Sequence, residues 1–138
     1  MQIEDCINFL LTGAQHKVFQ MMKKALDPFD LTPIQYGVLA CVWQKDIRNP
    51  KEVAEFLSIE NSTISGILER MESKDLLIRE IDPNDRRYIR IVLTEKSERL
   101  EKPVLKTVAE VNKEILKSFS ERDEDKLRAL LKAVIALP

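Results

Sequence analysis

Short polar side chains gather at one point in the middle of the chain, beside a glycine and about one helical turn before an arginine. The group consists of Asn61, Ser62, Thr63, Ser65, Gly66 and Arg70. Amide, hydroxyl and guanidinium groups make the hydrogen bonds that distinguish base pairs in a DNA groove. Because the first five side chains are small, the backbone that carries them can approach a groove closely. The alternative is that Asn61 or Ser62 only caps a helix and that its neighbours are solvated.

These residues begin the second of two predicted helices. The first starts at Asn49-Pro50, an N-cap followed by a proline, and Glu52 can reach back to the cap. Residues 58–60 interrupt its apolar pattern. The second helix has apolar residues at helical spacing, namely Ile64, Ile67, Leu68 and Met71. The pattern predicts a helix, a short turn and a second helix.

A charged hairpin is predicted to follow. Residues 76–81 and 88–93 are rich in apolar and β-branched side chains, which favour strands. The segment between them, 82–87, contains Asp82, Pro83 and Asn84, which are turn formers, and it ends in Arg86 and Arg87. Two strands with a basic tip form the wing of a winged helix-turn-helix.

The hairpin resembles the wing signature of the MarR family of transcription regulators, Asp-x-Arg followed by five residues and Leu-Thr. Asp85 and Arg87 supply the first part, and Leu93-Thr94 the second. The family usually has glycine where Asp75 and Ser97 stand; Asp tolerates a left-handed helix end, and a helix should gain from losing glycine at position 97.

The resemblance implies roles for the residues of the wing. Arg87 matches the family arginine that enters the minor groove of DNA. We expect Asp85 to fix the wing by bonding its turn, while Arg86 and Arg87 reach DNA.

The outer parts of the chain are expected to form helical arms. Apolar residues at helical spacing predict a first arm helix over residues 3 to about 26. The capping box of Thr32 and Gln35 then starts a helix of the central part, which runs to about Lys45. After the wing, Thr94 caps a long helix in which Pro103 predicts a kink or irregular turn near Arg99. A last helix follows Ser120-Glu121-Arg122-Asp123 and ends at Pro138.

The fold class that follows is mainly α: a winged helix-turn-helix with long N- and C-terminal helices forming a dimerisation region. We expect a single MarR-like domain over 1–138, in which 30–94 is the DNA-binding part and 1–29 and 95–138 are the helical dimerisation part. A chain of 138 residues, 44% hydrophobic, can bury one core. The apolar stripes of the arms exceed what that core can cover, which predicts a homodimer.

Charge gives less support to DNA binding than the motifs do. The formal net charge is −1, and residues 61–90 contain six basic and six acidic side chains. DNA affinity must therefore come from the placement of charges, with the wing arginines pointing outward and the acids elsewhere. A winged-helix protein-interaction module without DNA binding remains the alternative.

Several other classes are not indicated. No secretory signal or membrane-spanning run is visible, so we expect a cytoplasmic protein without a membrane partner. Cys6 and Cys41 fit no metal-ligand spacing, and Cys41 reads as an inert core residue. There is no phosphate loop, nucleophile elbow or catalytic set that the single histidine, His16, could serve. We therefore expect neither an enzyme nor a cofactor nor a metal.

The expected partners are double-stranded DNA with a palindromic operator, a second copy of the chain and a small effector. The function expected from the resemblance is sequence-specific transcriptional regulation by a repressor that a small aromatic or anionic ligand releases. His16 and Tyr36 are the polar candidates for the ligand site, at the junction of arms and head. An unregulated repressor, and an oxidant sensor at Cys6, are left open as alternatives.

Overall fold

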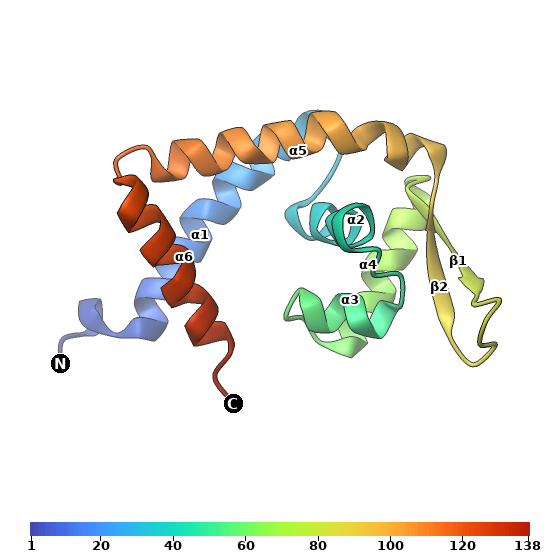
Figure 1. The fold of residues 1–138 in the computed structure, drawn as a ribbon, viewed down its shortest axis with the longest axis horizontal. Helices are drawn as coiled ribbons and strands as arrows, with labels where there is room; N and C mark the ends of the chain where they lie inside the picture. Colours follow the sequence, from blue (N-terminus) through green and yellow to red (C-terminus); the bar gives the residue numbers. More distant parts are fainter.

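The computed structural model describes residues 1–138, with the helical arms on one side of the molecule and the head on the other (Figure 1). Helix α5 runs from the head to the arms, and both chain ends lie on the side of the arms. The elements in order are η1 (Ile3–Asp5), α1 (Ile7–Leu26), η2 (Asp27–Phe29), α2 (Pro33–Lys45), α3 (Pro50–Phe56), α4 (Asn61–Ser73), β1 (Leu77–Ile81), β2 (Ile89–Leu93), α5 (Glu95–Leu116) and α6 (Glu121–Ile135). None of the helices is both long enough and apolar enough to cross a membrane.

Helix α2 begins where its sequence predicts. The Thr32 hydroxyl accepts the N–H of Gln35, and the Gln35 side chain accepts the N–H of Thr32, so the capping box is complete. Pro33 occupies the first helical position, where an N–H would have no partner. These contacts start α2 directly after the turn that follows α1.

The core of the head surrounds α2. Its fully buried residues come from every element of the head and from the ends of α1 and α5, among them Leu26, Leu39, Val53, Leu68, Met71, Leu77, Ile91 and Val104. Burial raises the pKa of the Cys41 thiol, which fits a core residue. The head is therefore one packed body to which the arms attach.

The wing is an antiparallel hairpin of β1 and β2. Leu77 pairs with Leu93 at its base, and Ile81 pairs with Ile89 near its tip. The N–H of Ile91 also donates to the carbonyl of Arg48, 2.8 Å away, which ties the hairpin to the loop between α2 and α3. Each strand is one residue shorter than predicted, and the predicted turn is in the expected place.

Two details of the arms differ from the sequence-based expectation. Helix α1 begins at Ile7 because a separate 3-10 turn occupies Ile3–Asp5. Helix α5 continues through Pro103 as one α-helix, so the irregular turn is absent, and a kink near Arg99 stays a prediction. Proline removes only one intrahelical donor, and the burial of Val104 next to it holds the helix in the core.

Few arm side chains are buried within one chain. Leu26 is the only buried residue of α1, and α6 has none. Large apolar side chains remain exposed on both, for example Phe9 (52%), Leu10 (51%), Leu130 (56%) and Ile135 (71%). One copy of the chain therefore leaves the apolar stripes of its arms uncovered.

The two positions at which the family usually has glycine differ physically. Asp75 ends α4 with φ 58°, in the left-handed region that Asp tolerates at some strain. Ser97 is fully buried in the first turn of α5, and its hydroxyl donates to the carbonyl of Leu76. Only Asp75 occupies a backbone conformation that glycine would relieve.

Glycine substitutions at these positions should therefore have opposite effects. Asp75→Gly should raise the free energy of unfolding by up to about 1 kcal/mol by removing strain. Ser97→Gly should lower it by about 1–2 kcal/mol, because a helix residue loses side-chain packing and the buried carbonyl of Leu76 loses one of its donors. Urea unfolding of the two variants beside the parent measures both. Changes of the same sign would contradict this account.

Candidate nucleic-acid interface

The polar face of α4 is bare. Its exposed residues are Asn61, Ser62, Thr63, Ser65, Glu69, Arg70 and Ser73, with Gly66 half-buried between them. On the opposite face Ile64, Ile67, Leu68 and Met71 are buried in the core. The packing of that apolar face fixes the helix and turns its polar side outward.

No side chain caps the N-terminus of α4. The cap residue is Glu60, which makes no side-chain bond, and Asn61 is already the first helical residue. The alternative in which Asn61 or Ser62 only caps the helix therefore does not hold. The N–H of Thr63 donates to the carbonyl of Glu60, and the N–H groups of Asn61 and Ser62, with the side chains beside them, remain available to an external acceptor.

Arg70 lies back along α4 towards the bare N-terminal turns. A Cβ added at Gly66 would stand 3.7 Å from a guanidinium nitrogen of Arg70, an ordinary van der Waals distance, so the guanidinium lies over Gly66. Arg70 has no acidic side chain within ion-pair distance. It is an unneutralised cation on the polar face.

At the wing tip, Asp85 holds Arg87 in one orientation. The carboxylate accepts the backbone N–H of Arg87 at 3.1 Å, its Nε at 2.9 Å and its Nη2 at 2.7 Å. The guanidinium carbon of Arg87 also lies over the ring of Tyr88, 5.5 Å from the ring centroid. The side chain of Arg87 is nevertheless 79% exposed. Asp85 bonds the turn as predicted. Its bonds to the side chain of Arg87 were not predicted from the sequence.

This pairing shifts both protonation equilibria. The bonds from Arg87 hold the pKa of Asp85 below its usual range, and the carboxylate raises the pKa of Arg87. Asp85 therefore stays ionised at neutral pH. The wing turn keeps its tie as long as that carboxylate is charged.

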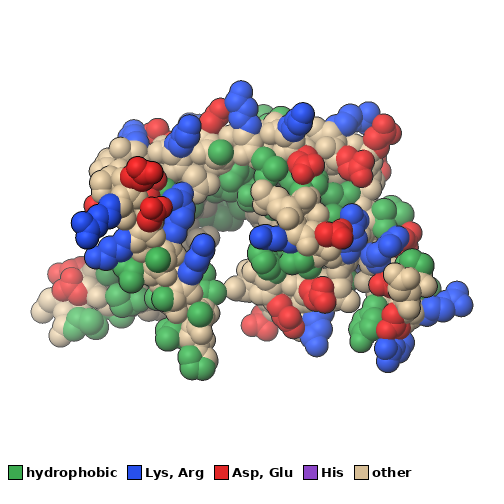
Figure 2. All heavy atoms as spheres, in the orientation of Figure 1, with side chains coloured by type: hydrophobic (Ala, Val, Ile, Leu, Met, Phe, Trp, Pro, Cys, Tyr) green, Lys and Arg blue, Asp and Glu red, His purple; other side chains and the backbone are tan.

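The remaining charges of the wing are largely paired. Glu72 bonds Arg79 at 2.7 Å, and Glu80 bonds Arg90 at 2.7 Å. Arg86 is exposed and has no acidic partner. Figure 2 shows Lys and Arg side chains at the outer end of the wing. The arginines point outward as predicted, whereas the placement of all acids elsewhere was wrong for Asp85.

The structure does not bring His16 and Tyr36 into one cavity. His16 is exposed on α1, where its ring contacts Gln20, and lines a shallow hollow with Phe19. Tyr36 packs against the core of the head, and burial raises its pKa. Phe19 lines a second cavity, with the start of α2 and with Arg70 and Lys74 of α4. Phe19 therefore lies at the junction of arms and head.

Sequence reasoning missed two contributors to this region. Tyr88 packs on Arg87, and the only signal for it is an aromatic residue directly after the arginine pair. Lys74, at the end of α4, reaches across to Asp30 and Gln35. Nothing in the local pattern marks it, because the contact joins positions far apart in the chain.

The helix pair α3–α4, with its bare polar face and adjacent hairpin, defines a winged helix-turn-helix protein. A family model described as "MarR family" matches residues 31–89, which cover the head from the start of α2 into β2. MgrA of Staphylococcus aureus, named as an HTH-type transcriptional regulator, is 35% identical over 97 residues. The organic hydroperoxide resistance transcriptional regulator of Bacillus subtilis is 30% identical over 95 residues. The chain belongs to the MarR family.

The aligned regions cover only part of each relative. They take in 70% of this chain and 66% of MgrA, and 69% of this chain and 65% of the Bacillus subtilis regulator.

Solved structures match the whole chain. CouR of Rhodococcus jostii RHA1, bound to p-coumaroyl-CoA, is 26% identical with a TM-score of 0.86, covering 100% of this chain and 97% of that one. CouR bound to a 23-mer DNA duplex is 28% identical with a TM-score of 0.81, covering 98% and 95%. Arms and head therefore have the arrangement of these structures.

The tie between Asp85 and Arg87 predicts a pH effect. Arg87→Ala should raise the pKa of Asp85 towards its usual value, because the bonds to the carboxylate are lost. In the parent, order in the turn should be retained down to pH values below that range and be lost as the pH falls through the lowered pKa. An NMR titration of the Asp85 carboxyl carbon measures this. The same midpoint in parent and variant would exclude the tie in solution.

Proposed function

We propose that this chain is a sequence-specific DNA-binding transcriptional regulator, a homodimeric repressor that a small ligand releases. The observation that carries the proposal is the bare, uncapped N-terminal face of α4, which stands beside a wing with two exposed arginines. We propose that it works in the cytoplasm and has no catalytic activity.

The roles follow from the chemistry of each element. The face of α4 with Asn61, Ser62, Thr63, Ser65, Gly66 and Arg70 would enter a major groove, where amide, hydroxyl and guanidinium groups read base edges. The wing would lie along the neighbouring minor groove, whose negative potential attracts Arg86 and Arg87. Asp85 would set the orientation of Arg87 without itself contacting DNA.

A second copy of the chain is the proposed cover for the arms. The exposed apolar residues of the arms lie on α1 and α6, at the end of the molecule opposite the wing. A symmetric pair joined there would present two α4 helices to successive major grooves and would bind a palindromic site. CouR in complex with a DNA duplex, which this chain resembles over nearly its full length, supports that mode.

Binding should depend on both reading elements. We expect Ser65→Ala, Arg70→Ala and Arg87→Ala each to weaken binding to a duplex selected by the parent from a random library. For each arginine the loss should be about 1–3 kcal/mol, as for one good DNA contact. Fluorescence anisotropy over a range of salt concentrations measures it, with circular dichroism as a check of the fold.

Arg122→Ala on α6 is the matched control, because it removes the same charge from an exposed position far from the head. Parent-like binding by all three reading variants would refute the assignment of the interface. If the folded parent retains no duplex even at low salt, the protein-interaction alternative, which the net charge of −1 favours, would replace the proposal.

The proposed effector site is the cavity at the junction of α1, α2 and α4. It measures about 320 Å³ and is lined by Phe19, Ile34, Gln35, Ile67, Arg70 and Lys74, among others, with no acidic side chain. An aromatic ring with a carboxylate fits these apolar walls with one free cation, Arg70, because the ammonium of Lys74 is already bonded to Asp30 and Gln35. His16 lines the adjoining hollow across Phe19, and Tyr36 stands behind it in the head. An anion there would engage Arg70, which the DNA face also needs.

DNA and effector should therefore oppose each other. Salicylate, as a simple aromatic carboxylate, should bind the free protein more tightly than the protein saturated with the selected duplex. It should lower DNA affinity by the same factor, because linkage is reciprocal. Calorimetric titrations with and without duplex measure this, and benzyl alcohol serves as the uncharged control. Equal salicylate affinity in both titrations would favour the unregulated repressor.

A further inference from the structure

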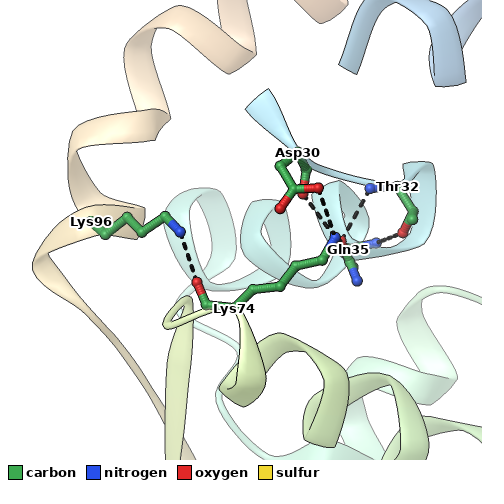
Figure 3. A network of polar contacts seen from close by, with 5 residues as sticks. All are labelled: Asp30, Thr32, Gln35, Lys74 and Lys96. Carbon is green, nitrogen blue, oxygen red and sulfur yellow. Dashed lines mark hydrogen bonds and ion pairs between the residues drawn. The ribbon is translucent and has the colours of Figure 1, made fainter. Parts of the chain in front are cut away.

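Lys74 uses its ammonium group inside the head, at the C-terminal end of α4. Its Nζ donates to the carbonyl of Asp30 at 2.9 Å and to Oε1 of Gln35 at 3.0 Å, and it lies 3.5 Å from the Asp30 carboxylate (Figure 3). The side chain is only 28% exposed. An ammonium has three donors, and three acceptors surround this one.

The acceptors are themselves held in place. Gln35 is 4% exposed, and its Oε1 also accepts the N–H of Thr32 in the capping box of α2. Asp30 has a left-handed backbone conformation, φ 55°, and its N–H is bonded to the carbonyl of Asp27. The side chain of Lys74 is therefore hydrogen-bonded to the segment that connects α1 to α2 and to the first turn of α2.

The backbone at the C-terminal end of α4 is hydrogen-bonded to side chains at the start of α5. The carbonyl of Lys74 accepts Nζ of Lys96 at 2.7 Å. The next two carbonyls accept the Thr94 hydroxyl, at 2.7 Å from Asp75 and 3.2 Å from Leu76. The end of α4 is thus joined both to the base of α1 and to the base of α5, which are the two arms.

We infer that Lys74 is a positioning residue for DNA reading, which fixes the tilt of α4 relative to the arms and does not contact DNA. The inference rests on the proposed function. Helix α4 has 13 residues, so its two ends are roughly 18–20 Å apart. A tilt of about 10° at Lys74 would move Asn61 by about 3 Å, more than a hydrogen bond to a base edge tolerates.

The position of Lys74 argues against a phosphate contact. Its ammonium is already saturated by protein acceptors, and it lies at the opposite end of α4 from the polar N-terminal turn with Asn61, Ser62 and Thr63. Loss of the ammonium should therefore disturb the geometry of base reading and leave the number of phosphate contacts unchanged. The two roles differ in how binding responds to salt and to DNA sequence.

The test uses Lys74→Met, which keeps most of the aliphatic stem and removes the three bonds. We expect the ratio of affinities for the selected and for random duplexes to fall about tenfold or more, because misplaced side chains lose base contacts but keep the charge attraction. The salt dependence of binding should stay that of the parent. Lys74→Arg, which can still donate to Asp30 and Gln35, should restore most of the ratio.

Two further variants complete the design. Lys96→Met removes the bond from α5 to the same end of α4 and should also lower the ratio of affinities for the selected and random duplexes. This variant keeps the test possible if Lys74→Met does not fold. Lys45→Met removes an equal charge from an exposed position on the head that makes no side-chain bond, and should behave as the parent.

An unchanged ratio in folded Lys74→Met and Lys96→Met would overturn the inference. So would an equal loss on both duplexes with a salt slope smaller by about one ion, which identifies a phosphate contact. If the parent binds no duplex, the proposed function fails first and independently of Lys74.

Discussion

The structure of the head depends on a single constraint on α4. One face must be buried deeply enough to fix the helix, while no side chain of the protein caps the N-terminal turn of the other face. Ile64, Ile67, Leu68 and Met71 meet the first demand. The second is met because the cap residue, Glu60, leaves the first turn open. Helix α2 at the centre of the core, the hairpin beside α4 and the ties at its C-terminal end all serve to keep that helix immobile.

Electrostatics in this protein are local. A net charge of −1 offers no general attraction to a polyanion. Glu72, Glu80 and Asp85 are instead engaged by Arg79, Arg90 and Arg87, and on the face of α4 and at the wing tip Arg70 and Arg86 have no acidic partner. Such an arrangement favours contacts at fixed places over diffuse association, so that selectivity depends on geometry more than on total charge.

The sequence predicted the fold well wherever the signal was local. The capping box at Thr32 and the turn residues 82–87 placed α2 and the hairpin within about a residue of their observed bounds. Pro103 does not interrupt α5, because a helix held by a buried neighbour tolerates one missing donor. The exposed polar face was predictable from periodicity. The contact of Lys74 with Asp30 and Gln35 was not, since residues about 40 positions apart meet only once the core has formed.

The hairpin extends beyond the body that supports it. At its base Leu77 and Ile91 are buried, and the N–H of Ile91 donates to the carbonyl of Arg48. At its tip the side chains of Ile81 and Ile89 remain 59% and 47% exposed. A two-stranded hairpin with so little packing is only marginally ordered by itself. Its outer half can therefore adjust to minor grooves of different width, but each binding event must offset the entropy lost when the tip becomes fixed.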